Sequence, residues 1–450
     1  MDKVTKSGID PVFYTLPDGK VTAEDLMAKL TSSSTFEVLR LLISAMFDEC
    51  KYMMDDKEFL DKVRQMKFDM MLVDGFFLAP CRFILPYHLG VPYIYEFTAK
   101  QDWMIGIPAL PSFHPYPDFS NSVFLSDKMN FGERVLNFFL ALMYNCMIPF
   151  PFTSDDSLLH EYAPGKTWED LTRQSELFLV TRDHMLEYPT VELPNVITVP
   201  GITVGPAKPL PADLEEIYKK AEYGVVVVSF GSLFQEASTE VVDSLFAAFS
   251  QLKQIVIMRY VGDIEGARKK APSNVYLLSW LPQNDMLGHE KTVAFVTHCG
   301  NNGVYESLYH GVPMVGAPIM SEQYHNAFLL VDRGYGLKVS GLNDFTSTEL
   351  FEALSEVTKN PKYRQQIKHA SSIIKAQKML PKAKLAFWVD HVMNFGGKHL
   401  RSASQDLPVY KLFMLDVWGF FSLTIVISVY LLRLVTRKYC KKRITKSKGD

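Results

Sequence analysis

The sequence has no large excess of charge of either sign. Its 47 Lys and Arg residues are nearly balanced by 50 Asp and Glu residues, which gives a formal net charge of −3. Binding to nucleic acid requires a concentrated basic surface, and this balance gives no sign of one. We therefore expect no nucleic-acid partner.

Cysteine is also scarce. The chain has five cysteines, an odd number spread widely along its length: Cys50, Cys81, Cys146, Cys299 and Cys440. Their spacing matches neither a set of metal ligands nor a disulfide framework. We expect no metal and no cofactor, and cysteine usage does not indicate the redox compartment.

The first 20 residues have no long apolar run. They read MDKVTKSGIDPVFYTLPDGK, which lacks the apolar core of a secretory signal peptide. Residues 412–435, in contrast, are almost wholly apolar, with Asp416 and Arg433 as the interruptions. About 20 apolar residues are enough to cross a bilayer, so residues 411–435 are predicted to form a transmembrane helix. A buried core helix is the alternative.

The last residues of the chain, 436–450, are basic. Seven Lys and Arg residues lie here: Arg437, Lys438, Lys441, Lys442, Arg443, Lys446 and Lys448. By the positive-inside rule this tail is cytoplasmic and the bulk of the protein is lumenal. The spacing of Lys446 and Lys448 from the chain end resembles the dilysine signal for return to the endoplasmic reticulum. We expect a single-pass membrane protein of the endoplasmic reticulum.

A lumenal protein needs a signal peptide, and residues 1–20 do not supply one. We interpret this conflict as the absence of the natural N-terminal segment. A tail-anchored protein with a cytosolic body is the alternative, but it would place the basic tail in the lumen.

The length of 450 residues favours two domains. In residues 1–203, short apolar runs at 68–74, 91–95 and 177–181 predict strands. The first run ends in Asp74, at the edge of a parallel sheet where α/β enzymes bind their ligands. Residues 193–213 contain five prolines and two glycines, which indicates a linker between domains.

Two other segments of the first domain are distinctive. Residues 108–120 are rich in proline and aromatic side chains and are predicted to form a long loop. Residues 135–152 are very apolar, and we favour a core helix. Contact with the membrane surface and the lining of an apolar pocket are the alternatives.

Residues 204–400 alternate strands and helices in a regular way. Five strands are predicted, at 224–230, 254–258, 275–278, 293–297 and 312–317. This alternation is typical of a doubly wound parallel sheet. Thr346 and Glu349 predict a capping box at one helix start, with Phe345 and Leu350 as its hydrophobic staple.

Two strand-to-helix turns of this second domain suit anionic ligands. One contains Gly231 and Ser232, and the other, residues 298–303, reads HCGNNG. Free backbone N–H groups at a helix start bind phosphate, and glycine allows close approach. His298 could donate to a diphosphate oxygen. A glycine-rich turn alone is weak support, because many α/β domains have one for geometric reasons.

Nearby residues could complete a nucleotide-sugar site. Trp280 and Gln283 offer an aromatic plane and an amide for a flat base. Glu306 could accept hydrogen bonds from two ribose hydroxyls, and Glu322 with Gln323 follows a strand where a sugar would project. The alternatives are a core role for Trp280, a solvated helix face for Glu306 and a helix cap for Glu322.

The segment 280–327 reads WLPQNDMLGHEKTVAFVTHCGNNGVYESLYHGVPMVGAPIMSEQYHNA. It resembles the signature of the animal UDP-glycosyltransferases, the group that includes the UDP-glucuronosyltransferases. The similarity extends to FDMMLVDGFFLAPC, LPNVITVPG, KPLP and VSFGS, and it covers nearly the whole chain. It implies a GT-B fold, with two Rossmann-like α/β domains, the acceptor in the first and the donor mainly in the second.

The resemblance also implies a role for each site residue. Trp280 stacks on uracil, Gln283 binds the uridine and Glu306 binds the ribose. The diphosphate and the donor sugar are assigned to the remaining residues: Ser232, His298, Asn302 and Gly303, then Glu322 and Gln323. This chain departs from the pattern twice, since Cys299 replaces a usual glycine and Glu322 a usual aspartate. The second departure leaves the identity of the sugar open.

The implied reaction transfers a hexosyl or glucuronosyl group from a UDP-sugar to a hydroxyl of a small lipophilic acceptor, with inversion. It needs a general base, which in similar enzymes is a histidine of the first strand-to-helix loop, steadied by an aspartate that Asp74 matches. The earliest histidine here is His88; it and His114 are weak substitutes. A missing N-terminal segment explains the absence of both the signal peptide and the base.

Other functions remain possible at this point. A non-catalytic chain could bind UDP-sugar, or form homo- or hetero-oligomers with related chains, without turnover. A UDP-sugar epimerase of similar fold is a third hypothesis, but it would be soluble.

Overall fold

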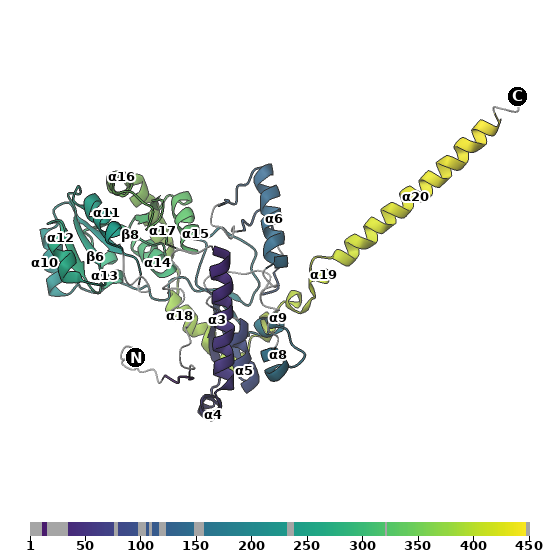
Figure 1. The fold of residues 1–450 in the computed structure, drawn as a ribbon, viewed down its shortest axis with the longest axis horizontal. Helices are drawn as coiled ribbons and strands as arrows, with labels where there is room; N and C mark the ends of the chain where they lie inside the picture. Colours follow the sequence, from purple (N-terminus) through teal and green to yellow (C-terminus); the bar gives the residue numbers. More distant parts are fainter. Residues whose placement is uncertain are drawn as a thin grey trace.

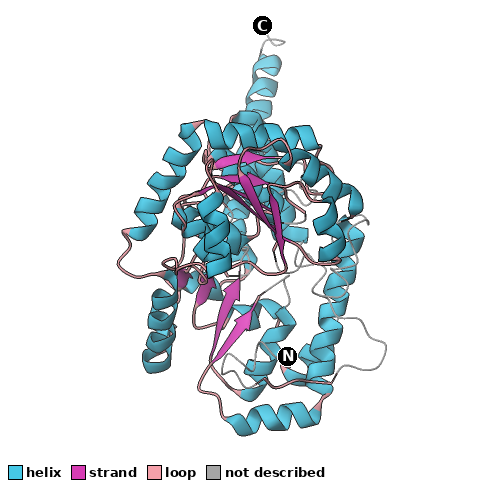
Figure 2. Ribbon diagram, turned by 90° about the vertical axis from the view of Figure 1, so that its left-hand side faces the viewer, coloured by secondary structure: helices cyan, strands magenta, loops and turns pink. Residues whose placement is uncertain are grey.

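The computed structural model describes residues 11–15, 35–75, 80–97, 105–107, 110–116, 123–147, 157–231, 238–319 and 322–446. These residues form two separate parallel sheets with helices around them (Figures 1 and 2). The predicted α/β class with two parallel sheets is therefore confirmed.

The first sheet has the strand order β1-β2-β3-β4 and is parallel throughout. Its strands are β1 (Met71–Asp74), β2 (Tyr93–Phe97), β3 (Phe178–Val180) and β4 (Val196–Thr198). Three of them match predicted strands. The fourth lies inside the segment predicted as a linker, so that prediction was wrong for these residues, because the surrounding prolines concealed a short apolar run.

The two faces of the first sheet pack against different parts of the chain, because alternate strand residues point to opposite sides. One face, with Tyr93, Tyr95 and Phe97, packs against the N-terminal helices. These are α3 (Thr35–Asp55), α4 (Lys57–Met66), η2 (Pro80–Phe83), α5 (Ile84–Leu89), α8 (Ser157–Tyr162) and α9 (Trp168–Arg173).

The other face, with Ile94 and Leu179, packs against α18 (Pro381–Phe395). Leu385, Trp388 and Val389 of α18 contact this face. A helix that follows the second domain in the sequence therefore covers the sheet of the first.

The second sheet has the order β10-β9-β8-β5-β6-β7, again parallel. Its strands are β5 (Val225–Ser229), β6 (Ile255–Arg259), β7 (Val275–Leu278), β8 (Thr292–Thr297), β9 (Met314–Gly316) and β10 (Gly336–Lys338). The five predicted strands are present, and β10 was missed because GLK has no apolar run. The strand order reverses between β5 and β8, which is the switch point where doubly wound folds bind ligands.

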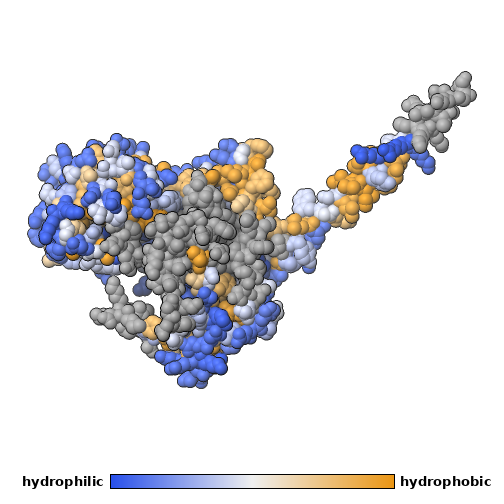
Figure 3. Space-filling model, in the orientation of Figure 1, coloured by the Kyte–Doolittle hydropathy of each residue, from blue (hydrophilic) through white to orange (hydrophobic). Residues whose placement is uncertain are grey.

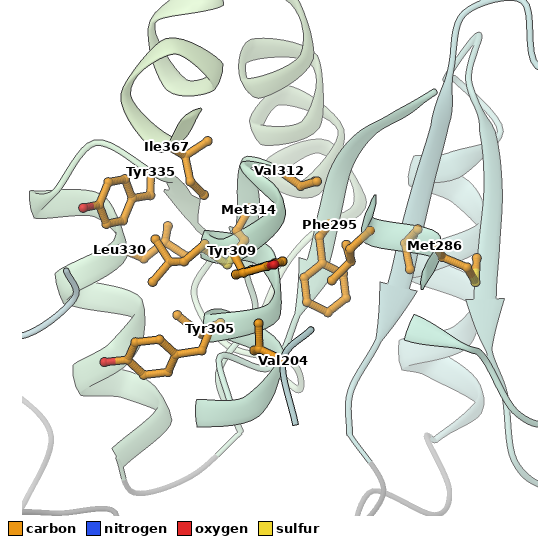
Figure 4. Packing of buried hydrophobic residues seen from close by; sticks show 14 of the residues in the cluster. Val204, Met286, Phe295, Tyr305, Tyr309, Val312, Met314, Leu330, Tyr335 and Ile367 are labelled. Carbon is orange, nitrogen blue, oxygen red and sulfur yellow. The ribbon is translucent and has the colours of Figure 1, made fainter. Parts of the chain in front are cut away.

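Both faces of the second sheet are buried. Val225 and Val227 of β5 point into one apolar cluster, and Val226 and Val228 point into another. The covering helices are α10 (Ala212–Lys220), α11 (Thr239–Phe249), α12 (Ile264–Lys270), α13 (Gln283–Gly288), α14 (Asn301–His310), α15 (Glu322–Asp332), α16 (Ser347–Lys359) and α17 (Pro361–Lys375). Figure 4 shows part of the first cluster, where Tyr309 of α14 lies next to Phe295 and Leu330 of α15 lies on the far side of Tyr309.

The start of α16 has half of its predicted capping box. Thr346 Oγ1 accepts from the backbone N–H of Glu349 at 3.2 Å. The Glu349 carboxylate, however, accepts from the backbone N–H of Ser340 at 2.8 Å instead of returning to Thr346. Phe345 and Leu350 are both buried in the same cluster.

After α18, short turns η3 (Lys398–Leu400) and η4 (Ala403–Asp406) lead to α19 (Val409–Leu412) and the long helix α20 (Leu415–Lys446). Residues Leu415–Lys438 of α20 are largely apolar, and the most apolar part of this stretch is not buried against the rest of the structure. The predicted helix is confirmed and is long and apolar enough to cross a membrane. It projects away from the rest of the chain (Figure 1).

The apolar segment predicted as a core helix forms α6 (Phe131–Met147). Leu140 and Ala141 are buried, but Phe138 is 54% exposed and Phe139 is 56% exposed. The core interpretation was therefore wrong for one face of the helix. Within the predicted loop, residues 110–116 form turns without helix or strand, and residues 108–109 and 117–120 lie outside the described part.

A disulfide joins Cys50 of α3 to Cys81 of η2. The expectation that the cysteines form no disulfide was wrong for this pair. The two residues lie 31 positions apart on different elements, and nothing in the local sequence brings them together. Cys299 is a free, buried thiol.

Candidate active site

The turn after β8 meets the start of α14 at the switch point. Gly300 is the N-cap residue of α14 and has no side chain with which to cap the helix. The first N–H groups of such a helix have no partner within the helix, and they attract anions. Asn302 is exposed in this first turn, and Gly303 is buried behind it.

His298 lies between the two turns that follow β5 and β8. A Cβ atom on Gly231 would lie 2.7 Å from the His298 ring, and one on Gly300 would lie 2.3 Å from His298 Nε2. Both glycines are therefore needed for this ring position. Burial lowers the pKa of His298 to about 4, so the imidazole is neutral at pH 7 and can donate through one N–H.

Cys299 has a left-handed backbone conformation, which accounts for the glycine that similar sequences usually have at this position. Its φ is 64°, in the left-handed region that glycine adopts without strain. The thiol points into the core, where burial raises its pKa to about 12. Asn326 of α15 donates to the Cys299 carbonyl oxygen at 2.8 Å and fixes the turn. The Cys299 side chain therefore does not occupy the space in front of the turn, where an anion would bind.

Gln283 and Glu306 are brought together, as the sequence predicts for a nucleoside site. Gln283 Nε2 donates to Glu306 Oε2 at 2.6 Å, and Thr203 Oγ1 donates to Glu306 Oε1 at 3.4 Å. Burial raises the pKa of Glu306 against the opposing effect of these hydrogen bonds. Glu306 is 9% exposed, which excludes the alternative of a solvated helix face.

Trp280 lies just beyond the end of β7, ahead of Gln283 at the start of α13. Its side chain is 62% exposed, so the alternative of a core role is wrong. A large exposed aromatic plane close to a polar pair is the arrangement that stacking on a base requires.

Glu322 and Gln323 begin α15, close to the end of β9. Gln323 Oε1 accepts from the backbone N–H of Ile319 at 2.9 Å, which ties the helix to the turn after the strand. Both side chains are half-buried. Ser232 lies outside the described residues.

The segment after β3 connects the first domain to this site. Asn301 Nδ2 donates to the Thr181 carbonyl oxygen at 2.9 Å, and Tyr305 Oη accepts from the Asp183 N–H at 2.8 Å. The start of α14, which offers N–H groups to an anion, is thus held directly by the first domain.

An ion cluster lies at the same contact. Arg182 forms a salt bridge with Glu187, whose second oxygen lies 3.2 Å from His325 Nε2 of α15. Burial opposes the charge of Arg182, but Glu187 and Glu322 raise its pKa above the usual value. Sequence reasoning missed these residues, although Arg182 directly follows the strand predicted at 177–181.

The edge of the first sheet carries two carboxyl groups. Asp74 pairs in register with Glu96 of β2, and its carboxylate lies 3.7 Å from Arg82. Burial, and then the charge of Asp74, raises the pKa of Glu96 to about 7. Glu96 was missed, although it ends an apolar run just as Asp74 does.

The two substitute histidines pack against tyrosines. The His88 ring lies 5.3 Å from Tyr162, and the His114 ring lies 5.0 Å from Tyr116.

Comparison with known proteins gives one consistent result. Residues 13–449 match the model of the family described as UDP-glucoronosyl and UDP-glucosyl transferase. The chain is 32% identical to UDP-glucuronosyltransferase 2A3 of Mus musculus, over 91% of this chain and 77% of that protein. It is 34% identical to the 2-hydroxyacylsphingosine 1-beta-galactosyltransferase of Mus musculus, over 87% of this chain and 72% of that protein.

Solved structures support the fold. The glycosyltransferase VinC, in complex with DTDP, aligns with a TM-score of 0.57 and 15% identity, over 87% of this chain and 90% of that chain. A UDP-glucosyltransferase from Polygonum tinctorium aligns with a TM-score of 0.52 and 19% identity, over 79% and 82%. The GT-B architecture predicted from the sequence is confirmed, and the chain belongs to the UDP-glucuronosyl and UDP-glucosyl transferase family as a UDP-glycosyltransferase.

Proposed function

We propose that the chain transfers a hexosyl or glucuronosyl group from a UDP-sugar to a hydroxyl of a small lipophilic acceptor, with inversion. The observation that carries this proposal is the arrangement at the switch point. There, the hydrogen-bonded pair of Gln283 and Glu306 lies beside the uncapped start of α14. A nucleoside and a diphosphate need these two partners side by side.

Each part of the donor has a proposed partner. Trp280 stacks on uracil, Gln283 binds the uridine, and Glu306 accepts from the ribose hydroxyls. Four residues are proposed for the diphosphate and two for the sugar: Ser232, His298, Asn302 and Gly303, then Glu322 and Gln323. Relatives of similar identity are named for glucuronosyl and for galactosyl transfer, so the donor sugar is a matter for experiment.

The proposed mechanism follows from these positions. The acceptor oxygen attacks the anomeric carbon as the bond from that carbon to the diphosphate breaks, and the electron pair remains on the leaving phosphate oxygen. The N–H groups of α14 and the neutral His298 stabilise this developing charge. A general base takes the hydroxyl proton, and Asp74 is proposed to position that base and stabilise its protonated form.

A substitution of Trp280 tests the donor site. Stacking on a base is worth about 1–3 kcal/mol, so Trp280→Ala should weaken UDP binding by about tenfold or more in calorimetric titration. Tyr223→Ala is the control, because Tyr223 is a similarly exposed aromatic residue elsewhere in the second domain. Unchanged UDP affinity in Trp280→Ala would contradict the proposed stacking.

The activity itself is tested by transfer from a panel of UDP-sugars to a generic phenol. Product formation supports the proposal and identifies the donor. UDP binding without transfer to any acceptor would instead favour the second candidate, a non-catalytic UDP-sugar-binding partner that acts in homo- or hetero-oligomers with related chains.

We also propose a single-pass location in the membrane of the endoplasmic reticulum, with the two domains lumenal and the basic tail cytoplasmic. The apolar span of α20 and the lysines that follow it support this orientation. The disulfide between Cys50 and Cys81 adds support, because such bonds persist in oxidising compartments. Protease treatment of sealed microsomes should remove only the tail; digestion of the domains would contradict the orientation.

A further inference from the structure

The helix α6 (Phe131–Met147) is apolar around most of its circumference. Its inner face buries Leu140 and Ala141. Its outer face exposes large apolar side chains at helical spacing: Phe131 (75%), Val135 (42%), Phe138 (54%), Phe139 (56%) and Leu142 (49%). A helix that is apolar all round belongs in a protein core or in lipid, and the outer face of α6 is not in the core.

The inner face holds the helix firmly in place. Leu140 and Ala141 join Tyr116, Leu125 and Met129 in one buried cluster. Asn137 accepts from the Tyr116 N–H at 2.7 Å and donates to the Pro111 and His114 carbonyl oxygens at 2.8 Å. This face already has its packing partners, so the outer face is presented in a fixed orientation.

The base of α20 is tied to the same region. Gln405, just before α19, is buried and donates to the Ile105 carbonyl oxygen at 3.0 Å. In Figure 1, α6 lies on the side of the first domain from which α19 and α20 emerge. Figure 3 shows apolar surface both at α6 and along α20.

The approach to α20 is apolar as well. Tyr410 is 49% exposed, Met414 is 53% exposed and Leu415 is 55% exposed. Exposed apolar residues therefore occur on α6 and at the point where α20 begins.

We propose that the outer face of α6 rests in the surface of the bilayer that α20 crosses. An apolar helix face of this kind sinks about 5–10 Å into the boundary between headgroups and acyl chains. A lipid surface suits this face because all exposed residues from Val135 to Met143 are bulky and apolar. The exposed charge of α6, Arg134, lies in the first turn over the Phe131 ring. The inference rests on the proposed membrane insertion of α20.

The test uses the full chain reconstituted in phosphatidylcholine vesicles. Single labelling sites are made by Phe139→Cys on α6, Leu423→Cys within α20 and Tyr223→Cys in the second domain, with Cys146 and Cys440 replaced by serine. Each site carries an environment-sensitive fluorophore, and lipids with a nitroxide on the acyl chain act as quenchers. Unchanged UDP affinity shows that each variant is folded.

The expected result is strong quenching at position 423, clear but shallower quenching at 139 and none at 223. Quenching at 423 with none at 139 overturns the α6 proposal and leaves the membrane span intact. No quenching at 423 instead overturns the membrane insertion proposed for α20. Energy transfer between labels at 139 on two chains, without lipid quenching there, would assign the face to a second copy.

A second variant checks the result independently. Phe138→Glu places a charge on the outer face, where the side chain is 54% exposed in the free protein, so folding should be unaffected. It should lower lipid quenching of a label at Leu142→Cys by at least half. Equal quenching with and without Phe138→Glu would contradict contact between this face and lipid.

Discussion

The position of the His298 ring depends on two glycines, which have no side chain to occupy its place. Gly231 and Gly300 leave room for the imidazole between the turns, and burial keeps it neutral. A neutral ring does not repel a cation and does not attract an anion by charge, so its contribution to diphosphate binding is a directed hydrogen bond. The effect of moving it should therefore be local and measurable.

Gly300→Ala should weaken UDP binding by about tenfold, close to the worth of one hydrogen bond to a charged group. The new Cβ would lie 2.3 Å from His298 Nε2, so the ring must leave its place. Gly205→Ala is the matched control, because a Cβ there meets nothing within 4 Å. If both variants bind UDP like the parent in calorimetry, His298 has no part in diphosphate binding.

Glu96 gives a prediction for pH. The pKa of Glu96 is about 7 in the folded chain, whereas its ordinary value is 4.5. Between about pH 4.5 and 7 the folded state therefore keeps a proton on Glu96 that the unfolded state has released. The stabilising contribution is complete below about pH 4.5 and is lost as the pH rises through about 7. The shift corresponds to at most about 3 kcal/mol.

Glu96→Gln should therefore raise the melting temperature more at pH 8 than at pH 5, relative to the parent. The control Glu352→Gln, at an exposed position of α16, should change the melting temperature by the same amount at pH 5 and at pH 8. An effect of Glu96→Gln that does not change with pH would mean that the carboxyl group is ionised in the fold.

The elements themselves were largely predictable from the sequence. Strands such as β5 and β8 are continuous apolar runs, which buried parallel strands require. β10 has no such run, and β4 lies among prolines, so neither is evident from the local sequence. Both form because a neighbouring strand offers hydrogen bonds. The outer face of α6 was misjudged because an apolar pattern does not say what lies against it.

The disulfide between α3 and η2 is an element-scale constraint with a measurable effect. It closes a loop of 31 residues, which corresponds to about 3–4 kcal/mol of lost chain entropy in the unfolded state. Cys81→Ser should lower the melting temperature, and dithiothreitol should then cause no further decrease. A melting temperature equal to that of the oxidised parent would show that this bond does not stabilise the fold.

At the scale of the whole molecule, the contacts between the two domains were the part that sequence could not predict. Gln283 and Glu306 lie 23 residues apart within one motif, and a short motif can reveal them. Glu187 and His325 lie 138 residues apart, on segments that meet only when both sheets have formed. The sequence of each segment shows an ionisable residue, but it does not show which residue of the other segment will contact it.

Arg182 and Glu187 provide the test of this contact. Removal of one member of a buried ion pair costs about 3–5 kcal/mol, because the other charge stays buried. Arg182→Met should therefore lower the free energy of unfolding in urea by about this amount, and added Glu187→Gln should restore most of it. Lys219→Met, which breaks an exposed pair, is the control and should change it by less than about 1 kcal/mol. A loss in Arg182→Met no larger than in the control would mean that water reaches the pair.

The segment that leads into α20 packs on the first domain. α18 packs on the sheet of the first domain, and Gln405 joins that domain again through Asn195 and Ile105 just before α20. The start of α20 is thus fixed to the first domain, although α20 follows the second domain in the sequence. If α20 is held in a bilayer, the first domain is fixed relative to the membrane, and any motion between the two domains would displace the second domain relative to the bilayer.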